Sequence, residues 1–208
     1  IALRNDQYPQ YQTGTFKAKF MGIFLNIFRE FVGTNTVVIY SGLIIGQTNF
    51  SLGSYTNFIL SVIAFAGTVV SHLFIAERVT RRFLMLLASS SFTVCNFLMM
   101  AGMITSTTAL TFTFMVIFLI IFGLTFAVIS SIYPAEILKY ERPSYTSLTA
   151  WPAMIFACLI PPIISDQLPT HTPWPIFLFY GIFALLSTIY IWFCAVESKG
   201  RQYVDIIR

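Results

Sequence analysis

The chain has 208 residues, of which 57% are hydrophobic, 17% are aromatic and only 10% are charged. A water-soluble domain carries about 25% charged residues, so this composition excludes an ordinary soluble domain. The net charge is +4, but the basic residues occur in short clusters between long uncharged stretches. This pattern does not indicate nucleic-acid binding. It predicts instead that most of the chain lies in a lipid bilayer.

Long stretches without Asp, Glu, Lys or Arg divide the chain into apolar segments. An α-helix needs about 20 apolar residues to cross a bilayer, and its backbone amides must be paired within the segment. We therefore expect an all-α, polytopic membrane protein. Residues 1–19 would form a polar lead-in, residues 20–195 a six-helix transmembrane bundle and residues 196–208 a polar tail. The six expected helices cover residues 20–46, 54–76, 83–104, 109–133, 145–165 and 174–195.

The positions of the basic residues predict the orientation of these helices. When six crossings are threaded, every Lys and Arg except Arg29 falls on one side, in the two terminal segments and the loops 77–82 and 134–143. The loops on the opposite side contain no Lys or Arg. Loops rich in Lys and Arg stay in the cytoplasm, so we expect both termini on the cytoplasmic side of a membrane that the sequence does not specify.

Two of the expected helices contain residues that interrupt a helix. The segment 33–36 reads Gly-Thr-Asn-Thr, a run of poor helix formers, so we expect the first helix to unwind there, near the middle of the membrane. Pro152, Pro161 and Pro162 predict a kink in the fifth helix, or a break near its outer end. The fourth helix is expected to end at Tyr133-Pro134, before an amphipathic turn on the cytoplasmic side.

Arg29 and Glu30 are charged residues inside the first expected helix, and Asn35 follows shortly after them. At 1.5 Å per residue Arg29 lies about 14 Å into the helix, where a charge costs at least a few kcal/mol. Two interpretations are open. In the first, Arg29 holds an anionic or polar group of a solute, Glu30 accepts hydrogen bonds or a proton, and Asn35 contributes its amide. In the second, Arg29 and Glu30 form a structural ion pair with another helix or subunit.

Acidic and basic residues also occur together at three places on the expected cytoplasmic face, within residues 77–82, 134–143 and 197–201. Surface ion pairs contribute less than about 1 kcal/mol each. The clusters are therefore either determinants of topology or a charge network that latches one conformation. The sequence contains no Ser/His/Asp set, phosphate-binding loop or metal-ligand cluster, so we expect no enzyme activity, no metal site and no cofactor.

At these same positions the chain resembles the sugar porter family of the major facilitator superfamily, specifically its C-terminal six-helix half. Family members carry Gln-Gln-x-x-Gly-Ile-Asn in their seventh helix, where this chain has residues 29–35. The family loop Glu/Asp-Arg-x-Gly-Arg-Arg corresponds to residues 77–82. The end of the tenth helix and the tail Pro-Glu-Thr-Lys-Gly-Arg correspond to residues 133–137 and 196–201. These four motifs, in order between six apolar segments, carry the resemblance over nearly all of residues 16–208.

The resemblance implies a solute site and an inner latch. The two sugar-binding glutamines of the family fall at Arg29 and Glu30, while Asn35 is kept. Most of the amide donors and the stacking face for a hexose are replaced, so the implied solute is small and polar or charged. The implied solute contacts are Arg29, Glu30, Asn35, Ser131 and Trp151, and the implied cytoplasmic latch consists of Glu77, Arg81, Arg82, Glu136 and Arg142.

The family fold has two six-helix halves with the solute between them near the middle of the membrane, and this chain supplies one half. We therefore expect a partner besides the lipid bilayer: an N-terminal six-helix half, a second copy or other membrane subunits. Two functions follow. The chain is either the C-terminal half of a secondary transporter that works by alternating access, or a transporter-derived structural subunit of a larger membrane assembly.

Overall fold

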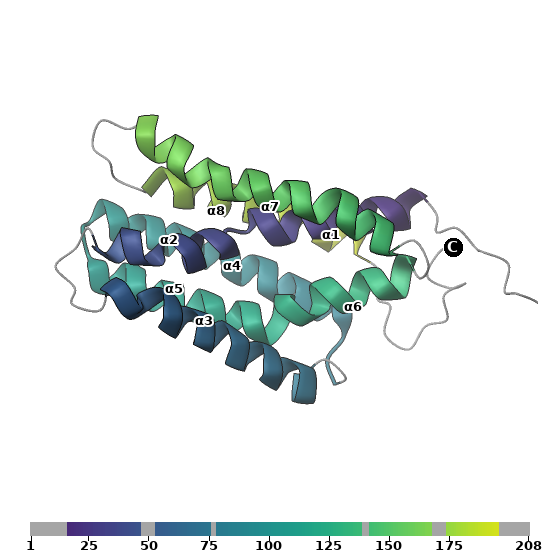
Figure 1. The fold of residues 1–208 in the computed structure, drawn as a ribbon. Helices are drawn as coiled ribbons and strands as arrows, with labels where there is room; N and C mark the ends of the chain where they lie inside the picture. The colour runs from purple at the N-terminus through teal and green to yellow at the C-terminus, as the bar shows by residue number, and fades with distance from the viewer. Residues whose placement is uncertain (1–15, 47–52, 76–77, 139–141, 168–173, 196–208) are drawn as a thin grey trace, which may run out of the picture.

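The structure is a computed structural model, and all the regular elements that it describes are helical. Figure 1 shows long helices lying side by side in an elongated bundle, with α1 and α2 end to end. The structure describes residues 16–46, 53–75, 78–138, 142–167 and 174–195. The elements are α1 (Phe16–Phe31), α2 (Thr34–Gly46), α3 (Gly53–Val70), the π-helix η1 (Ser71–Ile75), α4 (Arg81–Ile104), α5 (Thr108–Ile121), the π-helix η2 (Phe122–Phe126), α6 (Ala127–Leu138), α7 (Arg142–Gln167) and α8 (Trp174–Cys194).

Four helical stretches in the described ranges are long and apolar enough to cross a bilayer. They are Tyr55–Ile75, Arg81–Ile104, Thr108–Pro134 and Trp174–Cys194. Large apolar side chains cover the outside of these stretches, and Phe65, for example, is 71% exposed. Such surfaces are stable against lipid and not against water. The expected all-helical membrane protein is therefore confirmed.

The number of crossings stays a prediction. The first expected crossing is divided between α1 and α2, so neither piece is long enough to span alone. Within α7, the apolar stretch Leu148–Pro161 is shorter than a full span. Helix α1 also begins at Phe16, ahead of the boundary that we expected at residue 20.

The expected interruption of the first helix is present, although it is shorter than predicted. It falls at Val32 and Gly33, and Thr34 already belongs to α2. Gly33 has φ +94°, a left-handed conformation that glycine adopts far more readily than other residues. The Val32 amide still donates to the Phe28 carbonyl at 3.0 Å. The chain is therefore broken sharply at one point and helical on both sides.

One expectation about the prolines was wrong, and half of another is excluded. Helix α6 does not end at Pro134 but continues to Leu138. Pro134 deprives the Ser130 carbonyl of its helical donor, but burial of the neighbouring Tyr133, which is 2% exposed, holds this part of the helix in the core. Helix α7 runs from Arg142 to Gln167 through its internal prolines, so the break considered near its outer end does not occur, and the kink predicted as its alternative stays a prediction.

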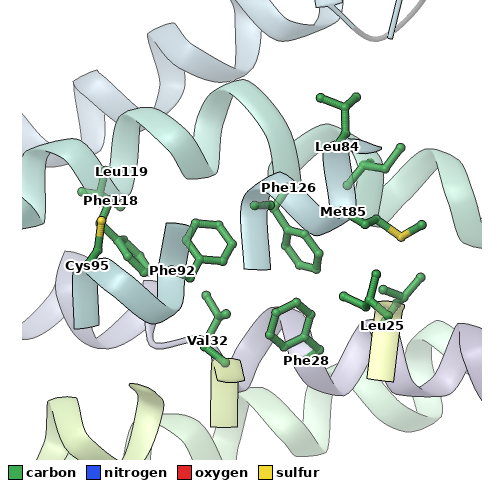
Figure 2. Packing of buried hydrophobic residues seen from close by; sticks show 14 of the residues in the cluster. Leu25, Phe28, Val32, Leu84, Met85, Phe92, Cys95, Phe118, Leu119 and Phe126 are labelled. Carbon is green, nitrogen blue, oxygen red and sulfur yellow. The ribbon is translucent and has the colours of Figure 1, made fainter. Parts of the chain in front are cut away.

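The core beneath the helix break is aromatic (Figure 2). Phe28 of α1 meets Phe126 of η2 edge-on, with 5.0 Å between ring centroids. Phe92 of α4 packs against Phe118 of α5 at 4.9 Å, and all four rings are fully buried. Aromatic pairs at these separations are favourable beyond the area that they bury. The end of α1 that carries Arg29 and Glu30 therefore rests on a rigid base.

Candidate functional site

The structure brings Arg29, Glu30 and Asn35 together at the junction of α1 and α2. Asn35 reaches back across the break, and its Nδ2 donates a hydrogen bond to Oε2 of Glu30 at 2.7 Å. Nε of Arg29 lies 3.6 Å from Oε1 of Glu30. Each carboxylate oxygen of Glu30 is therefore engaged by a different neighbour in the same chain.

The two charged side chains of this cluster differ in exposure. The Arg29 side chain is 44% exposed and that of Glu30 only 9%. Helix α1, which carries Glu30, packs against α7. A buried carboxylate requires a counter-charge and hydrogen-bond donors, and Arg29 and Asn35 supply them. In the described part of the chain, the guanidinium of Arg29 contacts Glu30 through Nε, so its terminal amino groups are available as donors.

Asn96 of α4 supports the break from the opposite side. This side chain is fully buried, and its Nδ2 donates to the Val32 carbonyl at 3.3 Å and to the Phe92 carbonyl at 2.9 Å. A helix end leaves carbonyls without intrahelical partners, so Asn96 satisfies one that the break exposes. The sequence contained a signal for this residue, because Asn96 is an amide within a long apolar segment.

Tyr180 of α8, like Asn96, is a residue at the break that the sequence did not lead us to predict. Its ring lies directly against Gly33, where an added Cβ would be 3.0 Å from Cγ. Its hydroxyl accepts a hydrogen bond from Thr36 Oγ1 at 2.8 Å and donates one to the Ala157 carbonyl at 2.9 Å. No sequence signal could have found it, since the partners come from helices distant in the chain.

Ser131 and Trp151 were the weaker candidates for solute contacts. Ser131 is half-buried on α6, and Trp151 is 61% exposed on α7. Within the described residues, no hydrogen bond joins either of them to the Arg29 cluster. Their assignment to a solute site is therefore a prediction that this structure does not test.

One ion pair of the predicted latch is present in the structure. Nη2 of Arg81, at the start of α4, lies 3.2 Å from Oε1 of Glu136, in the last turns of α6, and Nε of Arg81 donates to the same oxygen at 3.3 Å. The two side chains are 11% and 29% exposed, so solvent screens this pair less than a pair on an open surface.

The neighbouring Arg82 turns toward α8, where its Nη2 donates to the Trp192 carbonyl at 2.8 Å. Cations are favourable near the last carbonyls of a helix, so this contact secures the end of α8 to the start of α4. Glu77 and the side chain of Arg142, the other predicted members of the latch, lie outside the described residues.

A bundle of apolar helices defines a polytopic membrane protein, and a helix that is broken where it carries charged groups is a feature found in secondary transporters. Over residues 5–208 the chain matches the family described as "Sugar (and other) transporter". It therefore belongs to this family, the sugar porters of the major facilitator superfamily.

Two curated relatives are similar over nearly the whole chain. The "Major facilitator superfamily transporter mfsA" of Aspergillus fumigatus is 26% identical, over 94% of this chain and 38% of the relative. The "Probable metabolite transport protein CsbC" of Bacillus subtilis is 24% identical, over 93% of this chain and 45% of the relative. The chain thus spans less than half the length of these relatives.

Solved structures of the xylose transporter XylE have the same fold. A structure of this proton:xylose symporter with bound 6-bromo-6-deoxy-D-glucose superposes with a TM-score of 0.76 at 17% identity, covering 93% of this chain and 42% of XylE. A partially occluded, inward-open structure of XylE from E. coli gives a TM-score of 0.73 at 18% identity, covering 88% of this chain and 40% of XylE.

Proposed function

We propose that this chain is the C-terminal six-helix half of a secondary transporter that moves a small polar or charged solute by alternating access. The order of its four motifs matches the second half of the family pattern, and its superposition covers 42% of the XylE chain. An N-terminal six-helix half, encoded in the same protein or supplied separately, would complete the fold. Both termini of this half would lie on the cytoplasmic side.

The observation that carries this proposal is the cluster of Arg29, Glu30 and Asn35 at the helix break. Broken helices near the middle of the membrane form solute sites in transporters, and charged groups at that depth are functional by default. Glu30 holds the other two in place, and Arg29 presents its remaining donors outward. We also propose Ser131 and Trp151 as solute contacts, Ser131 through its hydroxyl and Trp151 through its exposed ring.

This geometry favours a solute that carries an anionic acceptor. The oxygens of Glu30 are already engaged, so the exposed polar groups nearest to a solute are the amino groups of Arg29. A guanidinium binds a carboxylate through two parallel hydrogen bonds, which an ammonium cannot reproduce. An uncharged hexose has no carboxylate to accept these two parallel hydrogen bonds. We therefore propose a small carboxylate-bearing solute, such as a sugar acid.

Uptake by the full-length protein in liposomes tests the proposal. Radiolabelled D-glucuronate and D-glucose form a matched pair, because they differ in a carboxylate against a hydroxymethyl group. We expect faster uptake of D-glucuronate, a loss of about tenfold or more in the Arg29→Gln variant and a partial loss in Arg29→Lys. Arg78→Gln, which removes an exposed loop cation, serves as the control. Equal uptake of D-glucuronate by Arg29→Gln and the wild-type protein would overturn the assignment of Arg29 to the solute site. A wild-type protein that assembles but transports neither D-glucuronate nor D-glucose would favour the function as a structural subunit.

The latch is a second part of the proposed mechanism. The Arg81–Glu136 pair joins the cytoplasmic-side ends of α4 and α6, and we propose that Glu77, Arg82 and Arg142 extend it. Such a network would hold one conformation and separate when the two halves rock.

A further inference from the structure

The break between α1 and α2 is held by α8 as well as by its own chain neighbours. Tyr180 is fully buried, and a Cβ added at position 33 would lie 3.0 Å from its ring, closer than an ordinary van der Waals contact. Gly33 in turn has the positive φ that makes the break possible. The ring of Tyr180 and the glycine therefore fit each other, and the ring fixes where the backbone of the break can lie.

The hydroxyl of Tyr180 ties together the two segments that flank Glu30. On one side it accepts from Thr36, the residue after Asn35. On the other side it donates to the carbonyl of Ala157 on α7, the helix that packs against α1. One phenol thus connects the first turn of α2, which follows the break, with α7.

We propose that Tyr180 is a positioning residue for the solute site, acting through the backbone at Gly33 and Thr36. The hydroxyl keeps Asn35 in hydrogen-bonding reach of Glu30, which keeps Arg29 directed outward. Asn96, which binds the Val32 carbonyl, supports the same break from α4. The link to solute binding rests on the proposed function, whereas the hold on the break does not.

Hydrogen–deuterium exchange of the full-length protein in lipid nanodiscs tests the hold on the break. Tyr180→Phe keeps the ring against Gly33 and removes only the hydroxyl. Thr36→Val removes the hydroxyl that donates a hydrogen bond to Tyr180. One hydrogen bond is worth about 1 kcal/mol, so each variant should exchange amides 30–37 about fivefold faster. Both substitutions remove the hydrogen bond between Thr36 and Tyr180. The double variant should therefore exchange these amides less than twice as fast as the faster of the two single variants.

Tyr190→Phe is the matched control, because it removes a phenol hydroxyl from the same helix at a ring that packs on Phe24. Unchanged exchange at 30–37 in both Tyr180→Phe and Thr36→Val, or an equal increase in Tyr190→Phe, would overturn the proposal. If Tyr180→Phe does not fold, Thr36→Val alone decides.

The second measurement concerns the link to solute binding. In a wild-type protein that takes up D-glucuronate, Tyr180→Phe should raise KM about fivefold and leave the maximal rate within about twofold. Faster exchange with an unchanged KM would overturn the positioning role. If the wild-type protein moves no probe, the proposed function fails, while the exchange data still decide whether Tyr180 holds the break.

Discussion

Asn35 donates a hydrogen bond to the carboxylate of Glu30 at 2.7 Å, across a helix break that separates the two residues. This contact closes a small loop of backbone around Gly33, and it places an amide donor and the Arg29 cation on the same buried carboxylate. The three polar side chains of the site are therefore joined to one another within α1 and α2.

The first prediction concerns this contact. Asn35→Ala loses a hydrogen bond to a charged group, worth about 1.5–3 kcal/mol. Asn35→Asp should be more destabilising, because it sets two carboxylates against each other in a poorly solvated site. The double variant Glu30→Gln/Asn35→Asp restores an amide–carboxylate bond with the roles exchanged and should recover most of the loss. Thermal unfolding in detergent measures the stability of all three variants. A double variant that is no more stable than Asn35→Asp would contradict the hydrogen bond between Asn35 and Glu30.

The second prediction concerns the ion pair between Arg81 and Glu136. A double-mutant cycle with Arg81→Gln and Glu136→Gln should give a coupling energy of about 1 kcal/mol or more, because the pair is partly buried and the guanidinium donates to the carboxylate through two nitrogens. Arg29→Gln combined with Glu136→Gln is the control and should be additive within about 0.5 kcal/mol, since Arg29 pairs with a different carboxylate. Unfolding free energies provide the values. Additivity in the Arg81 cycle would show that the pair contributes nothing.

The third prediction concerns the crossing of α3 and η2. A Cβ on Gly123 would lie 2.6 Å from the Ala64 carbonyl oxygen and 3.0 Å from Cα of Gly67. These are backbone atoms that cannot rotate away, so Gly123→Ala should destabilise the protein by about 1–3 kcal/mol or more. Gly181→Ala is the control, because its nearest neighbour is the ring of Phe97 at 3.3 Å, which can shift. Equal melting temperatures for the two variants would contradict the close approach.

The fourth prediction concerns topology. Ser106 and Arg78 are exposed at opposite ends of α4. In a background without native cysteines, Ser106→Cys should react with a membrane-impermeant maleimide from outside intact cells. Arg78→Cys should react only after permeabilisation, because basic loops stay in the cytoplasm. Labelling of both sites from the same side would exclude the six-crossing arrangement.

Local sequence was sufficient for much of the fold and part of the site. The apolar segments around α3, α4, α5 and α8 are read correctly because lipid imposes the same requirement on every span, independent of neighbours. The break near Gly33 followed from residue type alone. The grouping of Arg29, Glu30 and Asn35 followed from their closeness in the chain.

The errors have a common cause. Pro134 was expected to end a helix, but the burial of Tyr133 and the ion pair of Glu136 hold α6 in place beyond it. Helix α7 likewise passes through Pro161 without ending, which excludes the predicted break but not the predicted kink. A helix in a packed bundle tolerates a proline because contacts with other helices outweigh one lost hydrogen bond, and those contacts are not encoded in the local pattern.

The sequence by itself determined that this is a helical membrane protein with charged residues at a break in its first helix. Composition, the length of the apolar segments and glycine placement are local properties. Only the tertiary structure decided what holds that break, because Asn96 and Tyr180 reach it from α4 and α8. It also decided that Glu30 is buried while Arg29 faces outward, since exposure depends on how the helices pack and not on the order of the residues.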